Sequence, residues 1–299
     1  MFNIINTRKY WFSFSGLLVV LSIIGILTFG LNYGIDFTGG SIMELKLTDA
    51  SLENAVVEQV LTDLGIEESI VQPAGDNTLL IRTNHLNEDQ HTQILAGLEE
   101  KVVEQEGSIE ELRYDSIGPT IGQELKGKAL TSIFVVLLAI VAYIAFAFRK
   151  VSFPVASWKY GLAAIVALAH DVFITVGLFS ILGHFFNYQV DTLFVTALLT
   201  IMGFSVHDTI VTFDRTRENL FHSHDITFGE VVNKSINETI VRSLNTSLTT
   251  LLVLVSVYLF GGASIQQFIM TMIFGIIIGT YSSIFIASPL LMVWYKMKK

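Results

Sequence analysis

Six long apolar runs constrain the fold of this chain more than any other feature of its sequence. A helix needs about 20 mostly apolar residues to cross a bilayer, and each run is close to that length. The runs are Phe12–Leu31, Ala129–Phe148, Tyr160–Leu182, Val190–Phe213, Leu244–Phe260 and Phe268–Trp294. The sequence therefore predicts an α-helical polytopic membrane protein with six spans.

The composition supports this prediction and excludes several classes of protein. Charged residues make up 15% of the chain, whereas a soluble domain carries about 25%. This deficit excludes a simple soluble enzyme, a disordered tail and a nucleic-acid binder. No cysteine is present, so a disulfide, a thiolate nucleophile and a Cys–zinc site are all excluded.

The positive charges predict the orientation of the spans. Arg8 and Lys9 precede the first run as in a signal peptide, but the run is too long for one and lacks a small-x-small cleavage site, so we expect an uncleaved anchor. With a cytoplasmic N-terminus, 12 of the 18 basic residues fall in cytoplasmic segments. Cytoplasmic loops carry such an excess. Both termini are therefore expected in the cytoplasm, as in a multi-pass protein of a bacterial inner membrane.

Three regions follow from this topology. Residues 1–31 form the cytoplasmic N-terminus and first span, and residues 32–128 form a periplasmic domain. Residues 129–299 form the bundle of spans two to six, with a cytoplasmic loop at about 214–233 that is predicted to contain an interfacial helix. The periplasmic segment has 19 acidic and 6 basic residues, a net charge of −13. Such a charge favours solubility, or else repels anionic lipid or attracts a basic client.

The periplasmic segment reads as a small α+β domain. Alternating apolar and polar residues predict strands, and a 3.6-residue apolar period predicts helices. The predicted strands are Ser41–Leu47, Ile70–Gln72, Thr78–Arg82 and Ile109–Tyr114, and the predicted helices are Leu52–Leu64 and Glu88–Glu106. A turn is expected at Ala74–Asn77, between the second and third strands. This βαββαβ order is typical of a ferredoxin-like fold. His85 and His91 are expected at its surface and not in a metal site.

Ionisable residues inside the predicted spans carry the functional signal. Such residues cost about 2.5–3.5 kcal/mol at a helix centre on insertion scales, so they should face a cavity or a partner. They are His170 and Asp171 in the third span, His207 and Asp208 in the fourth, and Arg242 at the start of the fifth. A carboxylate near a cation can switch its protonation in a low dielectric. We interpret these five residues as a candidate proton relay, with a packing ion pair of Asp208 and Arg242 as the alternative.

Three further patterns bear on these residues. Thr192, Thr196, Thr200, Asp208 and Thr212 recur at four-residue spacing, and Arg242, Asn245, Thr246, Thr249 and Thr250 form a second polar stripe, so the two could line a hydrated path. The sixth span carries a small-xxx-small face at Gly275, Gly279 and Ser283, for which we expect helix packing. Adjacent His and Asp on one helix point about 100° apart and do not chelate a metal, so no metal site is expected. No motif of an intramembrane hydrolase is present.

Five motifs in this chain resemble signatures of the SecD/SecF family, within the RND superfamily. They lie at Gly34–Ser41, Ile117–Leu125, His170–Thr175, Ser205–Asn219 and Ser235–Ser247, and they follow the family's order over the whole chain. The length favours the shorter of the two family members. His207 is a variation, because the family often has Asn there. The family signature residues are Gly34, Asp36, Phe37, Gly39, Gly40, Gly118 and Pro119.

The glycines of the first signature, Gly34, Gly39 and Gly40, permit positive φ angles and a tight exit from the membrane. Gly118 and Pro119 would do the same on the return. These positions fit either a hinge or a rigid connector.

The resemblance implies a non-enzymatic auxiliary subunit of the Sec protein-export machinery, without a cofactor. It would pair with SecD and use proton flow to help draw preproteins outward through the SecYEG translocon, with YajC and YidC as further partners, in the lipid bilayer and without nucleic acid. Two rivals remain: half of an RND-type small-molecule or lipid exporter, and a passive scaffold of the translocon. Proton-dependent activity would exclude the scaffold.

Overall fold

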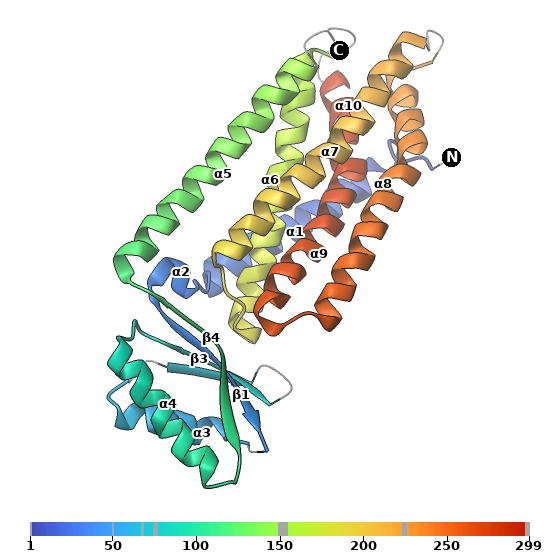
Figure 1. Ribbon diagram of the computed structural model, residues 1–299. Coiled ribbons are helices and arrows are strands. Elements are labelled where there is room, and N and C mark those ends of the chain that lie inside the picture. Colours follow the sequence, from blue (N-terminus) through green and yellow to red (C-terminus); the bar gives the residue numbers. More distant parts are fainter. Residues whose placement is uncertain are drawn as a thin grey trace. The chain divides into compact units, whose positions relative to one another are not determined.

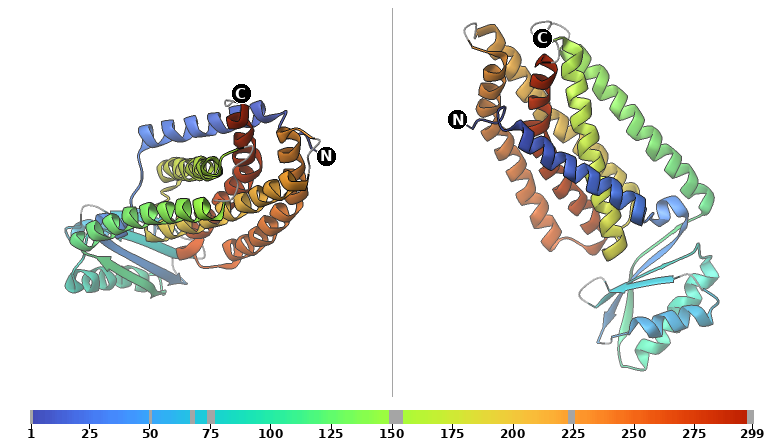
Figure 2. Two further views of the ribbon diagram at one scale, coloured as in Figure 1. Left: turned by 90° about the horizontal axis from the view of Figure 1, so that it is seen from above. Right: turned by 180° about the vertical axis from the view of Figure 1, so that it is seen from behind.

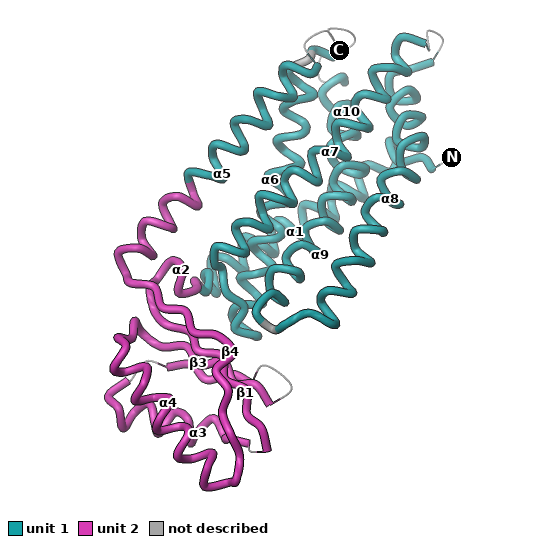
Figure 3. The backbone as a smooth tube through the Cα atoms, in the orientation of Figure 1, with its two compact units in different colours: residues 1–32, 131–299 teal, residues 33–130 magenta. Residues whose placement is uncertain are grey.

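The computed structural model describes residues 2–49, 51–66, 69–73, 77–148, 155–222 and 226–296. It divides into two units (Figure 3), one of residues 1–32 and 131–299 and the other of residues 33–130. Each unit is described by itself below.

Six helices in the described part of the chain are long and apolar enough to cross a membrane, as the sequence predicts. They are α1 (Arg8–Phe29), α5 (Pro119–Ala147), α6 (Ser157–Phe186), α7 (Thr192–His222), α8 (Phe228–Phe260), and a last rod of α9 (Ala263–Ser282), the π-helical turn η1 (Ser283–Ala287) and α10 (Ser288–Lys296) (Figure 1). Pro289 follows the π-helical turn. Because proline has no backbone N–H, it cannot donate the hydrogen bond that a regular α-helix would have at this position.

The helix ends differ from the predicted spans at the polar flanks. The predicted interfacial helix at 214–233 is wrong, because α7 continues to His222 and α8 already begins at Phe228. These polar turns stay helical because their side chains pair across the hairpin. Arg215 Nε donates to Glu238 Oε2 at 2.6 Å, and Asn219 Nδ2 donates to the same oxygen at 2.8 Å. α5 likewise begins at Pro119, well before the apolar run at Ala129.

Small residues set the close helix contacts of the first unit. A Cβ on Gly279 would lie 2.9 Å from the Cβ of Ser205 on α7, and a Cβ on Gly275 would overlap Ile201. The small-xxx-small face of the sixth span is therefore a packing face, as predicted. Gly177 of α6 packs in the same way against Ser22 of α1. Figure 2 shows α1 next to α6 in the view from above and crossing α6 in the view from behind.

The second unit contains a four-stranded sheet with the order β2-β3-β1-β4. Its elements are β1 (Gly40–Thr48), α3 (Asn54–Asp63), β2 (Ser69–Pro73), β3 (Thr78–Thr83), α4 (Glu88–Val103) and β4 (Ser108–Ile117), preceded by the short helix α2 (Ile35–Thr38). The β1–β3, β1–β4 and β2–β3 pairs are all antiparallel. The succession of strands and helices from β1 to β4 is the one that the sequence predicts.

Apolar side chains of the sheet and of α3 and α4 form one core, which includes Leu45, Leu61, Ile81 and Leu98. The helices lie together on one side of the sheet (Figure 1). Of the predicted turn at Ala74–Asn77, residues 74–76 lie outside the described residues. His91 is buried and not at the surface as expected, because its ring stacks on Tyr114 at 3.8 Å between centroids and its Nε2 lies 2.8 Å from Glu111 Oε1.

Candidate intramembrane polar site

Asp171 lies at the centre of a polar cluster that joins three helices. The residue is 1% exposed, and its Oδ2 accepts hydrogen bonds from Ser205 Oγ of α7 at 2.6 Å and from Ser282 Oγ of α9 at 2.7 Å. Its Oδ1 lies 2.9 Å from His170 Nδ1. Both carboxylate oxygens are therefore satisfied, which is the condition for burying such a group without a large penalty.

His170 is also buried, but only one of its two ring nitrogens is used. Nδ1 contacts Asp171, whereas Nε2 has no hydrogen-bond partner among the described residues. The ring faces Tyr281 at 6.3 Å between centroids, and the Tyr281 hydroxyl in turn contacts Ser15 of α1. The imidazole therefore has one buried ring nitrogen that none of the described residues engages.

Asp208 is buried in a different environment on α7. It is 3% exposed, and its Oδ2 has no hydrogen-bond partner in the described part of the chain. The hydroxyl of Ser243 on α8 lies beside the carboxyl, yet no hydrogen bond of ordinary geometry joins the two groups. Asp208 is thus the buried carboxylate of the bundle that retains an unsatisfied oxygen, whereas Asp171 is fully engaged.

Arg242 and His207 both point away from the interior. Each side chain is exposed, and no ion pair joins Arg242 to Asp208 among the described residues. Ser243 of α8 faces Asp208. Because adjacent residues of a helix point about 100° apart, Arg242 lies on a different face of α8 from Ser243 and does not face Asp208. The packing ion pair of Asp208 and Arg242, which the sequence left open as the alternative to a relay, does not occur in the part of the chain that the structure describes.

The predicted polar stripe on the fourth span divides between two faces of α7. Thr196 and Thr200 are exposed and donate to carbonyls of their own helix, whereas Asp208 and Thr212 are buried. A four-residue spacing drifts by about 40° per step relative to a 3.6-residue turn, so its ends face opposite directions. The second predicted stripe, on α8, is exposed at Arg242, Asn245, Thr246 and Thr249 and half-buried at Thr250.

The glycine-rich signature after the first span forms a close contact with the signature before the second. Gly39 and Gly40 have positive φ angles of 79° and 140°. A Cβ on Gly39 would lie 2.8 Å from Pro119 Cα, and one on Gly40 would lie 2.7 Å from the Thr83 carbonyl oxygen. Gly34 departs from the expectation, because its φ of −73° is open to any residue.

The other signature residues surround this contact. Phe37 is buried, Asp36 lies in α2, and Gly118 precedes α5 in open space. The close packing at Gly39 excludes a side chain there and brings the residues before β1 into contact with the first residue of α5.

Family models match most of the chain. The model for the C-terminal part of protein export membrane proteins SecD/SecF matches residues 98–297, and the SecD/SecF GG motif matches residues 24–50. The chain belongs to the SecD/SecF family.

Individual family members are similar over nearly the full length. The protein translocase subunit SecF of Thermobaculum terrenum is 40% identical over 98% of this chain and 94% of its own length, and that of Anaerolinea thermophila is 39% identical with the same coverage. Among solved structures, SecDF of Thermus thermophilus, a translocon-associated membrane protein, matches with a TM-score of 0.84 and 33% identity over 99% of this chain. This chain spans only 39% of that SecDF chain.

The sequence did not predict the serine hydroxyls that lie next to Asp171 and Asp208. Ser205 and Ser243 lie within family motifs, but nothing in their local pattern marks them as partners of Asp171 and Asp208. Ser282 is 111 residues from Asp171, so only the packing of α6 against α9 brings them together. No group of three or more metal-ligating side chains occurs in the residues that the structure describes.

Proposed function

We propose that this SecD/SecF family chain is an accessory subunit of the Sec protein translocase that pairs with SecD and uses the proton motive force to assist preprotein export. The names of its relatives and its likeness to SecDF support the translocase role. Its partners would be SecD and the SecYEG translocon, with YajC, YidC and preprotein clients.

The observation that carries the proton role is the state of Asp208. A carboxylate that is 3% exposed and has an unsatisfied oxygen is costly to keep ionised, so proton binding relieves the penalty. Asp208 is therefore the proposed proton acceptor. Moving one proton through 100 mV releases about 2.3 kcal/mol, and a few protons could bias a change between two conformations.

The exposed polar face of α8 supports pairing with another membrane protein. Arg242, Asn245, Thr246 and Thr249 would contact lipid tails if the chain were alone in the bilayer. Polar groups in membrane spans almost always face a protein partner or water. In our proposal SecD covers this face and supplies the group that meets Arg242, while His207, His170 and Asp171 support the relay.

The orientation and the role of the second unit complete the proposal. Both termini lie in the cytoplasm of a bacterium, and residues 33–130 lie outside the inner membrane. The antiparallel order β2-β3-β1-β4 with two helices on one side supports a ferredoxin-like assignment of this unit. Proton flow would move it relative to the spans, about a hinge near the Gly39 signature, and so draw the preprotein outward.

Export in inverted membrane vesicles under an imposed proton gradient tests the proposal. Asp208→Asn keeps the size of the side chain but cannot titrate, so gradient-stimulated export should be lost while assembly with SecD is retained. Asp214→Asn is the matched control, because Asp214 is an exposed carboxylate six residues further along α7 that pairs with Arg217. Equal stimulation in wild type and Asp208→Asn would contradict the relay.

The two rival functions predict different results. A passive scaffold predicts export that does not respond to the gradient in wild type. An RND-type exporter half predicts gradient-driven efflux of a small molecule or lipid and no effect on preproteins. A chain that purifies as a stable monomer without a second six-span protein would contradict the pairing with SecD.

A further inference from the structure

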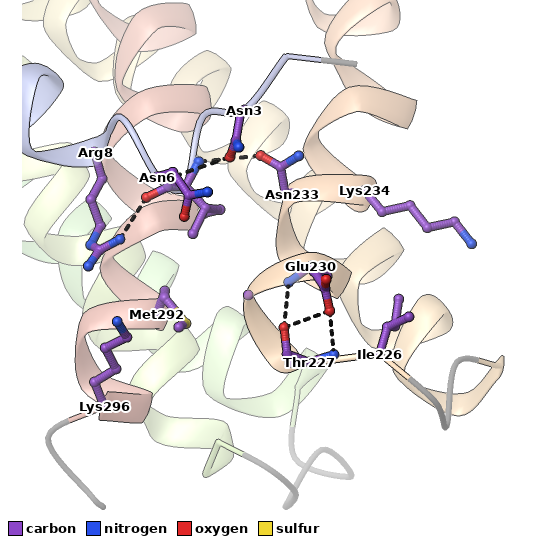
Figure 4. A pocket seen from close by; sticks show the side chains of 12 residues that line it. Asn3, Asn6, Arg8, Ile226, Thr227, Glu230, Asn233, Lys234, Met292 and Lys296 are labelled. Carbon is purple, nitrogen blue, oxygen red and sulfur yellow. Dashed lines mark hydrogen bonds between the residues drawn. The ribbon is translucent and has the colours of Figure 1, made fainter.

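A cavity of about 600 Å³ lies where α1 and α8 begin and α10 ends, at one side of the bundle. Its lining comes from the segment before α1, from the start of α8 and from the end of α10 (Figure 4). Neither of the buried carboxylates described above lines it, and its lining residues lie outside the family motifs.

One wall of the cavity is a segment that is fixed in place by main-chain contacts. Residues 2–7, here called the N-terminal strap, run across α8. Asn237 accepts a hydrogen bond from the Phe2 N–H at 2.7 Å and donates to the Phe2 carbonyl at 2.9 Å, while Asn233 accepts from the Ile4 N–H at 2.9 Å. Ile4 and Ile5 of the strap are buried. The strap is thus part of the folded bundle and gives the cavity a defined wall.

The charge of the cavity is predominantly positive. Arg8 and Lys296 lie on one side of it, and Lys234 lies at the opposite rim (Figure 4). Arg8 is positioned by a hydrogen bond of 2.8 Å from its guanidinium to the Ile5 carbonyl. Among the residues that line the cavity, the one carboxylate is that of Glu230, and it caps the first turn of α8. Its Oε2 accepts hydrogen bonds from the Thr227 N–H at 2.7 Å and from the Thr227 hydroxyl at 2.8 Å.

The place of the cavity limits what its ligand can be. Spanning helices begin at Arg8 and end at Lys296, so these two cations lie at the level where a membrane helix leaves the hydrocarbon. Phospholipid phosphates occupy that level, and basic pockets between spanning helices bind anionic headgroups. Arginine also offers a planar fork that matches two phosphate oxygens.

We propose that this cavity binds the phosphate of an anionic membrane phospholipid between Arg8 and Lys296. The apolar side chains of Ile5, Ile226 and Met292 share the lining and would contact the glycerol and the first acyl carbons. Asn3 and Asn6 on the strap offer amides to the headgroup. A free phosphate ion would contact the cations but not the apolar side chains, whereas a phospholipid would contact both.

Lipid titration followed by native mass spectrometry of the purified full-length chain tests the proposal. Wild type should bind phosphatidylglycerol more tightly than phosphatidylcholine. The variant Arg8→Gln/Lys296→Gln should bind phosphatidylglycerol roughly 30-fold more weakly, from the contribution of each cation near a lipid surface. Lys9→Gln/Lys159→Gln removes two cations that do not line the cavity and is the matched control, which should bind as wild type does.

Further arms keep the test decisive. Arg8→Lys/Lys296→Arg retains both charges and should keep most of the affinity, which separates loss of binding from loss of folding. Unchanged phosphatidylglycerol affinity in Arg8→Gln/Lys296→Gln, or equal affinity of wild type for both lipids, would overturn the site. Inorganic phosphate alone should not raise the melting temperature of wild type, and an increase equal to that given by phosphatidylglycerol would overturn the lipid as the ligand.

Discussion

Removing the hydroxyls that hold Asp171 should destabilise the bundle in a non-additive way. Ser205 and Ser282 donate to the same oxygen, Asp171 Oδ2, from two different helices at 2.6 and 2.7 Å. A single hydrogen bond between membrane helices contributes on average about 0.6 kcal/mol and at most about 1.7 kcal/mol. We therefore expect Ser205→Ala and Ser282→Ala each to lower the free energy of unfolding by an amount in that range.

The double variant should lose more than the sum of its parts. With one serine gone, the other still donates to Oδ2, but with both gone this buried oxygen has no donor and only His170 remains on the carboxylate. A buried acceptor that is left without any donor costs about 1–3 kcal/mol, and more when the group is charged. Alanine keeps the Cβ of Ser205 that packs on Gly279, so the loss would reflect hydrogen bonding and not a cavity.

Unfolding in mixed micelles, followed by circular dichroism, measures these free energies. Ser256→Ala is the control, because this exposed serine of α8 bonds only to the Leu252 carbonyl of its own helix and should change stability by less than about 0.5 kcal/mol. A double variant whose loss equals the sum of two small single losses would show that the carboxylate does not depend on these donors, and would refute the reasoning.

Three further outcomes are expected. Arg242→Lys and Arg242→Gln should both lose gradient-stimulated export at normal protein levels, because lysine lacks the planar fork of arginine; wild-type export in both would reduce Arg242 to an anchor. Gly279→Leu should lower the melting temperature markedly, since even a Cβ there would lie 2.9 Å from Ser205, whereas Gly203→Leu, with open space around it, should be tolerated; similar melting temperatures would count against the packing face. Asn237→Ala should make residues 2–7 accessible to limited proteolysis without reducing expression, and an unchanged cleavage pattern would show that the strap is held by its apolar residues alone.

The lengths of apolar and alternating runs were sufficient to predict the six spanning helices and the succession of strands and helices in residues 33–130. They were insufficient at the helix ends. The first turns of α8 mix polar residues with buried Phe228, Val232 and Ile236 and therefore fall outside any apolar run, yet they are helical, and Glu238 pairs there with Arg215 of the facing helix.

The candidate site, too, could be predicted from the sequence only in part. Counting residues places Asp208 and Arg242 at one depth, because the rise of a helix is constant. Which side of α8 faces α7 depends on the packing of the whole bundle, and there Ser243 takes the inner position while Arg242 is exposed. The engagement of Asp171 by Ser282 depends on a contact between distant segments, so no local pattern could reveal it.

The hydrogen bonds of the N-terminal strap impose an order on biogenesis. Phe2 is synthesised long before its partner Asn237, which lies 235 residues later in the chain, so the strap cannot dock until the helices from α1 to α7 and the first turns of α8 have been synthesised. Until then its peptide groups are hydrated and its two isoleucines lack their cover. Because the asparagines bind main-chain atoms, they are indifferent to side-chain identity in the strap but sensitive to its register. Substitutions of Phe2, whose side chain is exposed, should therefore be tolerated over evolutionary time far better than an insertion or a deletion between Ile5 and Arg8.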